Sequence, residues 1–162
     1  GYVLQLLGFH ILNDISWYKP NASPNLSCRF FTASHETIIW ARKEIKWKHY
    51  FDYDSMKNWD WHNDALKKPG LQMRSVWSIH PPKWWEKLHG KHPTQKPIEL
   101  LKRIIIASSK EGDIILDPFS WSATTWIACE MIWGRKYIWI EQELEYLNLS
   151  IKRYEDIQLL KT

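Results

Sequence analysis

Hydrophobic and polar residues alternate over two stretches near the beginning of the chain. Phe9, Ile11, Ile15 and Trp17 fall on alternate positions of residues 9–17, which predicts a β-strand. A similar stretch at residues 36–41 predicts a second strand, which would pair with the first as a hairpin. Residues 2–7 predict a short helix closed by Gly8, because glycine readily adopts the left-handed conformation common at helix ends.

From residue 92 onward the hydrophobic pattern is different. Pro97, followed by Leu100, Leu101, Ile104 and Ile105, predicts a helix with one apolar face. Apolar runs at residues 114–116 and 137–140 precede helical segments at about 123–132 and 143–154, and such runs are typical of buried parallel strands. This alternation predicts an α/β domain whose parallel strands are joined by right-handed crossovers.

Residues 43–90 show neither pattern clearly. They are polar, rich in Lys, Asn, Asp and Trp, and weakly periodic. Two interpretations remain open for this region, a recognition loop and a partly ordered insert.

Composition limits the class of protein. The chain has 162 residues, of which 44% are hydrophobic and 25% charged, as expected for one globular domain. No apolar run approaches the roughly 18 residues of a membrane span, so we expect no membrane partner. The two cysteines, Cys28 and Cys129, predict neither a disulfide framework nor a Cys-rich zinc site and favour a cytoplasmic location. The net charge of +4 is compatible with a polyanionic partner and equally with an ordinary soluble surface.

Polar residues follow both predicted parallel strands. Residues 117–125 form a turn into a helix, and Glu141 ends the next strand. Ligands of open α/β sheets bind at the carboxyl ends of the strands, where an acid can accept hydrogen bonds from ribose hydroxyls. The alternative of a generic strand–helix–strand unit with a capping loop remains open at this point.

Five segments of the chain resemble, in order, the motifs of DNA amino-methyltransferases. The segments are residues 13–19 (NDISWYK), 34–40 (SHETIIW), 92–97 (HPTQKP), 117–125 (DPFSWSATT) and 135–141 (RKYIWIE). The resemblance implies a class-I S-adenosylmethionine-dependent methyltransferase-like (Rossmann-like) α/β sheet, here incomplete and with an inserted recognition region. It implies a methyltransferase core at residues 1–42 and 91–162 and a target-recognition region at residues 43–90.

The motif order resembles the beta group of these enzymes. Its members mostly methylate adenine N6 and some methylate cytosine N4, so the implied reaction is methyl transfer from S-adenosyl-L-methionine to an exocyclic base amine, adenine N6 first. The implied partners are double-stranded DNA, a second copy in a homodimer, and a cognate restriction endonuclease system. A nucleotide-dependent oxidoreductase is disfavoured, because Ser120, Ser122 and Thr124 do not match its glycine-rich fingerprint.

The resemblance assigns site residues one by one. The cofactor-binding residues it implies are His92, Thr94, Lys96, Asp117, Phe119, Ser122, Thr124, Thr125 and Glu141. The predicted DNA-binding residues are Lys43, Lys46, Lys48 and Arg74, since basic residues interleaved with aromatic ones suit phosphate contact. No metal site is predicted, because the histidines show no convergent spacing.

The family's catalytic Asp/Asn-Pro-Pro-Tyr tetrapeptide does not occur in the chain. Residues 80–83 (HPPK) lack both the acid or amide and the aromatic residue. That motif binds and stacks on the flipped base, and the resemblance places it upstream of Gly1. We therefore expect these 162 residues to be inactive alone. The competing interpretation is a non-catalytic DNA-binding remnant.

The chain contains 12 Trp and 6 Gly. Trp121, Ala123, Trp126 and Trp139 stand where the family pattern has glycine. Three interpretations remain open: genuine tryptophans that disturb cofactor binding, UGA codons that the organism reads as glycine, and a degenerate sequence. TGG codons at positions 121, 126 and 139 would exclude the second.

Overall fold

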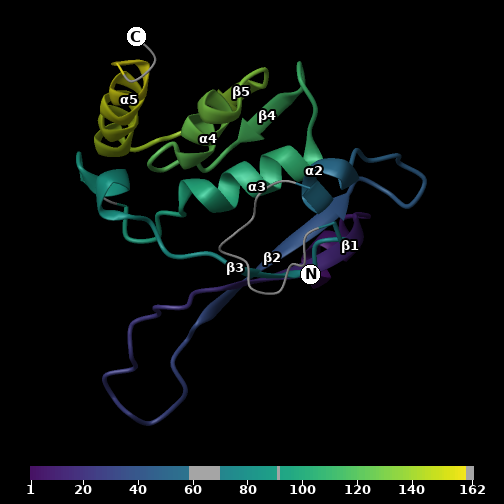
Figure 1. Cartoon of the computed structure of the whole chain (residues 1–162), viewed down its shortest axis with the longest axis horizontal. Helices are drawn as coiled ribbons and strands as arrows, with labels where there is room; N and C mark the ends of the chain where they lie inside the picture. The colour runs from purple at the N-terminus through teal and green to yellow at the C-terminus, as the bar shows by residue number, and fades with distance from the viewer. Residues whose placement is uncertain (59–69, 91, 160–162) are drawn as a thin grey trace. The chain divides into compact units, whose positions relative to one another are not determined.

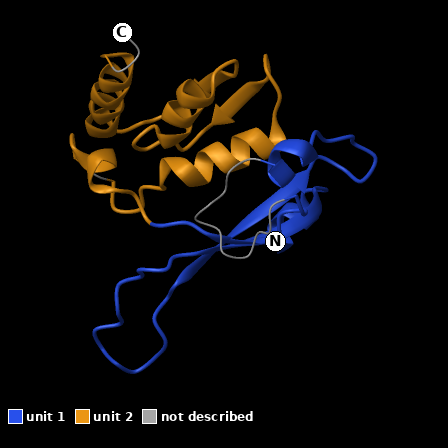
Figure 2. Ribbon diagram, in the orientation of Figure 1, with its two compact units in different colours: residues 1–80 blue, residues 81–162 orange. Residues whose placement is uncertain are grey.

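The computed structural model describes residues 1–58, 70–90 and 92–159 of the protein. Residues 59–69 of the predicted recognition region lie outside the described residues, as do residues 91 and 160–162 of the predicted core. The chain divides into two compact units, residues 1–80 and 81–162 (Figure 2).

The first unit is built on the hairpin that the alternating pattern predicted. Strand β1 (His10–Tyr18) pairs antiparallel with β2 (His35–Arg42), with a bulge between Ile11 and Asn13. Helix α1 (Tyr2–Leu6) precedes β1, and Gly8 has the positive φ of +83° expected of a residue that ends a helix. The predictions for residues 2–17 and 36–41 are confirmed, with element ends shifted by a residue or so.

A third strand joins this sheet from the stretch that showed no clear pattern. Strand β3 (Val76–Ser78) pairs in parallel with β1, so the strand order is β2-β1-β3. Trp17 and Trp77 are buried, and the Trp17 indole donates a 2.7 Å hydrogen bond to the carbonyl of Ile79. Residues 43–90 also contain helix α2 (Tyr53–Asn58) and the 3₁₀ turn η1 (Trp84–Lys87), so part of this stretch is regular structure.

The second unit has the strand–helix–strand–helix order that the sequence predicted (Figure 1). Helix α3 (Ile98–Ser108) leads into β4 (Ile114–Asp117), helix α4 (Thr124–Ile132), β5 (Lys136–Trp139) and helix α5 (Leu144–Leu159). Strands β4 and β5 pair in parallel, as predicted. Helix α5 continues five residues beyond the predicted end at residue 154.

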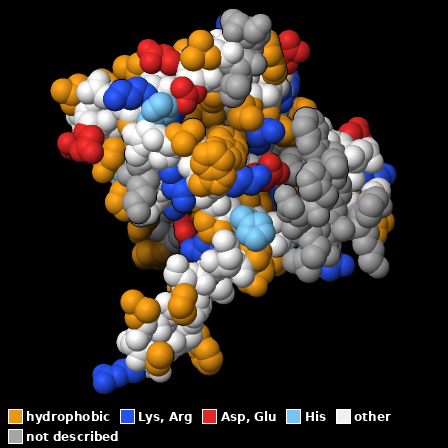
Figure 3. Space-filling model, turned by 60° about the vertical axis from the view of Figure 1, so that its left-hand side comes forward, with side chains coloured by type: hydrophobic (Ala, Val, Ile, Leu, Met, Phe, Trp, Pro, Cys, Tyr) orange, Lys and Arg blue, Asp and Glu red, His pale blue; other side chains and the backbone are white. Residues whose placement is uncertain are grey.

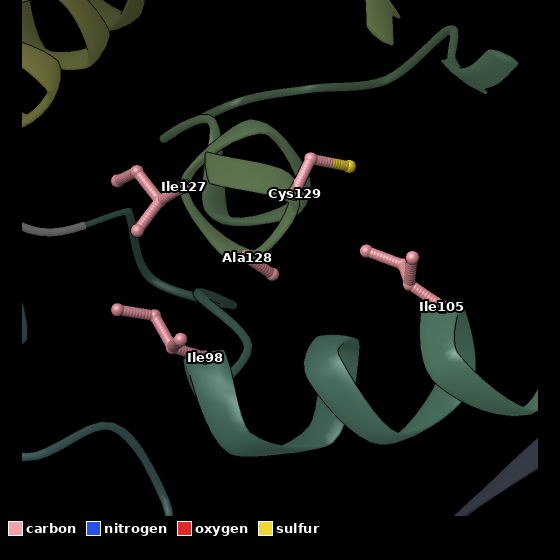
Figure 4. Close-up of a cluster of buried hydrophobic side chains, with 5 residues drawn as sticks. All are labelled: Ile98, Ile105, Ile127, Ala128 and Cys129. Atoms are coloured by element: carbon pink, nitrogen blue, oxygen red, sulfur yellow. The ribbon is translucent and has the colours of Figure 1, made fainter. Parts of the chain in front are cut away.

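The core of this unit lies between α3 and α4. Figure 4 shows Ala128 of α4 and Ile105 of α3 directed into the space between the two helices. Ile98, Ile127 and Cys129 complete the buried cluster. Burial raises the pKa of the Cys129 thiol to about 11, so the thiol is neutral at pH 7 and behaves as a small apolar side chain.

The prediction that both parallel strands are fully buried is wrong. Ile114 and Leu116 of β4 are 61% and 59% exposed, and Ile138 of β5 is 52% exposed. Ile115 and Tyr137 point the other way and pack against the helical core. The strands therefore alternate between a covered and an open face, because α3 and α4 cover only one face of a two-stranded sheet. The expectation of an incomplete sheet is confirmed.

The helical core and the open face of β5 can be compared by the same Ile→Val substitution. Ile127→Val removes a methyl group from the α3–α4 core and should lower the free energy of unfolding by about 0.5–1.5 kcal/mol. The control Ile138→Val removes the same group from the open face and should change it by less than about 0.5 kcal/mol. Urea unfolding followed by circular dichroism measures both. Equal decreases in the free energy of unfolding would mean that the outer face of β5 is buried.

Candidate functional site

The second unit brings two of the predicted motif segments together at one sheet edge. Asp117 ends β4 opposite Trp139 of the parallel strand β5. Beyond the strands the backbones stay joined, because the Ile140 amide donates to the Asp117 carbonyl at 3.0 Å and the Ser120 amide donates to the Ile140 carbonyl at 3.1 Å. The turn after β4 and Glu141 therefore lie side by side, at the edge where α/β sheets bind ligands.

The Asp117 carboxylate organises the turn. One oxygen accepts a 3.1 Å hydrogen bond from the Phe119 amide, and the other accepts a 2.6 Å bond from the Thr125 hydroxyl of α4. These bonds close the turn onto the first residues of α4, whose amide groups favour negative charge. Phe119 is left 74% exposed. Across the edge, the Glu141 carboxylate accepts a 2.9 Å bond from the Glu143 amide.

Two predicted cofactor residues, Ser122 and Thr124, are buried against helix α5. The Arg153 guanidinium donates to the Ser122 carbonyl and lies 3.4 Å from the Thr124 hydroxyl, which is itself 3.4 Å from the Ser122 hydroxyl. Burial lowers the pKa of Arg153 to about 10, opposed in part by the negative charge of Glu86, so Arg153 remains charged at neutral pH. The hydroxyls of Ser122 and Thr124 thus have partners inside the protein. The exposed part of the turn is formed by other residues, among them Phe119 and Trp121.

Helix α5 holds the same loop at a second point. The Ser150 hydroxyl lies 3.2 Å from the Trp121 carbonyl and 2.7 Å from the Tyr146 carbonyl, both of which accept from it. Sequence reasoning missed both Ser150 and Arg153. A buried arginine and serine in a polar helix resemble surface residues, and their loop partners are about thirty positions away.

His92 contacts the loop that follows β4, and Thr94 contacts His92. The His92 ring stacks on the Trp121 indole, with centroids 4.6 Å apart and planes 5° apart, and its edge meets Tyr146 of α5. The Thr94 amide donates a 3.2 Å bond to Nδ1 of His92. Lys96 lies half-buried in the segment that leads into α3. That His92, Thr94 and Lys96 bind the cofactor remains a prediction.

A buried glutamate that the sequence did not indicate anchors this segment. Glu86 of η1 accepts a 2.9 Å bond from the Ile98 amide at the beginning of α3, and a 3.0 Å bond from the Lys83 amide. The Gln95 side chain donates to the Glu86 carbonyl at 2.8 Å. Because the carboxylate caps α3 from twelve residues upstream, no local capping pattern could have revealed it.

Three non-glycine residues of this unit have backbone conformations that favour glycine. Trp121 and Ala123 have φ values of 49° and 54°, and Trp133 combines φ 57° with ψ 157°, a region almost exclusive to glycine. Trp126 and Trp139 have no positive φ and stack on one another with centroids 5.2 Å apart. The backbone therefore supports glycine-type positions at 121 and 133, and gives no such support at 126 and 139.

The predicted DNA-binding residues lie in the first unit. Lys43, Lys46 and Lys48 are exposed in the loop after β2, and Arg74 is exposed two residues before β3. Because Arg42 pairs with His10, the loop after β2 lies at the end of the sheet where β1 begins. Strand β3 begins opposite Ser16, so Arg74 precedes a strand that pairs with the last part of β1. The loop packs back on the sheet through Trp40, whose ring lies 5.4 Å from that of Phe51.

Two kinds of site are not found in the described part of the chain. Residues 1–58, 70–90 and 92–159 contain no group of three or more His, Cys, Asp or Glu side chains that could hold a metal ion. Within the same residues, no helix has the length and apolar character needed to cross a membrane.

Comparison with known proteins identifies the family. The fold places the chain among class-I methyltransferase-like α/β proteins, since it is similar to a crystal structure of the M1.HpyAVI–SAM complex with a TM-score of 0.72 and 32% identity. That match covers 93% of this chain and 65% of the other. Residues 1–152 match the family model described as DNA methylase. The chain belongs to the DNA methylase family.

Curated relatives extend this result. The chain is 52% identical over 157 residues to the Type II methyltransferase M2.MboI of Moraxella bovis, which covers 97% of this chain and 54% of that protein. It is 53% identical over 156 residues to the Type II methyltransferase M2.DpnII of Streptococcus pneumoniae, covering 96% of this chain and 55% of that protein. The chain thus spans about half the length of these relatives.

The backbone conformation of Trp133 gives a direct stability test. Trp133 is 68% exposed, so Trp133→Gly removes a side chain that is mostly in solvent, and the relief of backbone strain should raise the free energy of unfolding by about 1 kcal/mol. The control Trp84→Gly changes a tryptophan of η1 that is 75% exposed and has no positive φ, and it should lower the free energy of unfolding by about 0.5–1 kcal/mol. Urea unfolding measures both. Similar losses in the two variants would contradict a glycine-type position at 133.

Proposed function

We propose that this chain is the cofactor-binding half of a site-specific DNA methyltransferase. The enzyme transfers a methyl group from S-adenosyl-L-methionine to an exocyclic base amine, adenine N6 in the first instance. The observation that carries the proposal is the joining of the Asp117 turn to Glu141 at the carboxyl ends of β4 and β5. The choice of adenine rests on the motif order, which resembles a group whose members mostly act on that base.

The residues at this edge fit an adenosine-containing cofactor. Glu141 is half-buried at the end of β5, where a carboxylate can accept hydrogen bonds from ribose hydroxyls. The exposed ring of Phe119 offers an apolar face to the adenine. His92, Thr94 and Lys96 lie in the segment of residues 92–97, to which the resemblance assigns cofactor binding. When bound, the cofactor supplies an electrophilic methyl group on a sulfonium.

The cofactor would not require the Trp121 side chain at this edge. Its indole is 37% exposed and stacks on His92, in a loop where the backbone already has the conformation of glycine. Ala123 is fully buried, so its methyl group fits the loop. Whether position 121 carries tryptophan or glycine in the organism therefore decides how much of the edge the cofactor can use.

The DNA contact is proposed for residues 43–90. Exposed Lys43, Lys46, Lys48 and Arg74 suit phosphate contacts, which set affinity and register rather than sequence choice. Because the chain spans about half of its curated relatives, methyl transfer itself is proposed for the whole protein, with the tetrapeptide that holds the flipped base. A homodimer and a cognate restriction endonuclease belong to the same proposal.

A matched pair of glutamates tests cofactor binding. Glu141→Gln removes the charge that would accept from the ribose and should weaken S-adenosyl-L-methionine binding about tenfold, since hydrogen bonds to charged groups contribute roughly 1.5–3 kcal/mol. Glu143→Gln keeps the backbone amide that binds Glu141 and should leave affinity unchanged. Isothermal titration calorimetry measures both. Salt-sensitive DNA binding by a wild-type chain that gives no heat with the cofactor would favour the non-catalytic remnant.

Methyl transfer is tested on the whole protein. With radiolabelled S-adenosyl-L-methionine and bacterial DNA, we expect label in N6-methyladenine after digestion to nucleosides and chromatography. The Glu141→Gln variant of the whole protein should lose most of this label, whereas Glu143→Gln should keep it. Label in N4-methylcytosine would correct the target base, and unlabelled DNA from a protein that binds the cofactor would contradict the activity.

A further inference from the structure

One face of helix α5 contacts both segments that the resemblance assigns to the cofactor. Tyr146, Ser150 and Arg153 are spaced four and three positions apart, so they lie on the same face of the helix. Tyr146 meets the ring of His92, in the segment before α3, with centroids 4.6 Å apart. Ser150 and Arg153 bind the loop that follows β4. A single helix face therefore joins the two segments.

The bonds from α5 to the loop go to backbone carbonyls. The Ser150 hydroxyl lies 3.2 Å from the Trp121 carbonyl, and the Arg153 guanidinium donates to the Ser122 carbonyl. A trans peptide unit points its carbonyl and its amide in opposite directions, so the same bonds fix the directions of the two amides that follow. Because these contacts are made with the backbone, they are the same whether position 121 carries tryptophan or glycine.

Arg153 is a buried cation whose hydrogen bonds are incomplete. It is 6% exposed, and its Nη2 atom is buried with no hydrogen-bond partner in the described part of the chain. The negative charge of Glu86, which is 5% exposed, favours the charged form of Arg153. The Glu86 carboxylate also accepts a 2.9 Å bond from the Ile98 amide at the beginning of α3. An apolar side chain of similar size often costs less than a buried cation, so stability alone does not account for an arginine here.

We propose that Arg153 is a positioning residue for S-adenosyl-L-methionine, which holds residues 121–124 in the conformation that receives the cofactor and does not touch the cofactor itself. Ser150 and Tyr146 assist from the same face of α5. The inference rests on the proposed function, because it takes S-adenosyl-L-methionine as the ligand. Apparent affinity falls in proportion to the fraction of protein that holds the binding conformation, so a looser loop binds more weakly although every contact atom remains.

The test compares three variants of the full chain. Arg153→Met removes the charge and the donors, and Arg153→Lys keeps the charge on a smaller donor group. The control Lys152→Met removes a charge from an exposed position of the same helix. Figure 3 shows Lys and Arg side chains mixed with Asp and Glu on the face that it draws, and the loss of one exposed charge in such a mixture changes little.

Two measurements are made on each variant. Isothermal titration calorimetry gives the affinity for S-adenosyl-L-methionine, and hydrogen–deuterium exchange without the cofactor reports how often the loop opens. Arg153→Met should weaken binding about tenfold, as expected if about one molecule in ten holds the binding conformation. The amides of residues 121–125 should exchange faster in this variant, whereas those in the middle of α3 should keep wild-type rates. Arg153→Lys should recover binding to within about threefold of the wild type, since its ammonium can still donate to a carbonyl. Lys152→Met should match the wild type in both measurements.

The outcomes separate this inference from the proposed function. If Arg153→Met binds like the wild type while Glu141→Gln binds more weakly, the positioning role is excluded and the cofactor site stands. Weaker binding with unchanged loop exchange would mean that Arg153 touches the cofactor. Faster exchange throughout the second unit would mean a purely structural role, and either result overturns the inference.

The lysine variant covers the case in which Arg153→Met does not fold. A positioning role then requires that Arg153→Lys show faster exchange confined to residues 121–125 together with weaker binding, and wild-type behaviour in both measurements would overturn it. A wild-type chain that gives no heat with S-adenosyl-L-methionine would overturn the proposed cofactor site and this inference with it.

Discussion

Everything proposed for the second unit depends on the parallel pairing of β4 with β5. The pairing continues past the strands, where the Ile140 amide reaches the Asp117 carbonyl and the Ser120 amide reaches the Ile140 carbonyl. Backbone hydrogen bonds therefore fix the turn after one strand against the acid after the next. Side-chain bonds from Asp117 to Phe119 and Thr125 then set the shape of the turn. Without that register, Glu141 would have no fixed relation to the turn.

Helix α5 makes the loop rigid from the other side. Arg153 and Ser150 bind the carbonyls of Ser122 and Trp121, the two residues that precede the left-handed Ala123. A strained backbone conformation persists where the surrounding contacts hold it in place, as these hydrogen bonds do. The bond to the Ser122 carbonyl offsets part of the cost of burying the Arg153 charge, and its Nη2 atom is buried with no hydrogen-bond partner in the described part of the chain. A loop held in this way tolerates tryptophan at a glycine-type position.

The first unit places two different surfaces at the two ends of one small sheet. A basic loop with Lys43, Lys46 and Lys48 lies at one end, and the loop of residues 19–34, with the exposed side chains of Phe30 and Phe31, lies at the other. The two surfaces lie at opposite ends because an antiparallel hairpin sends its turn and its exit to opposite ends of the sheet.

The sequence alone determined the hairpin, the strand–helix–strand order, and the positions of Asp117 at the end of β4 and of Glu141 after β5, because each depends on local periodicity or on a short motif. Tertiary structure decided the rest. Strand β3 has three residues and exists through pairing with β1, and Arg153 and Glu86 act on partners 31 and 12 positions away. Exposure of Ile114 and Leu116 depends on which faces the helices cover. Local patterns carry no record of such long-range contacts, and so only the folded chain shows them.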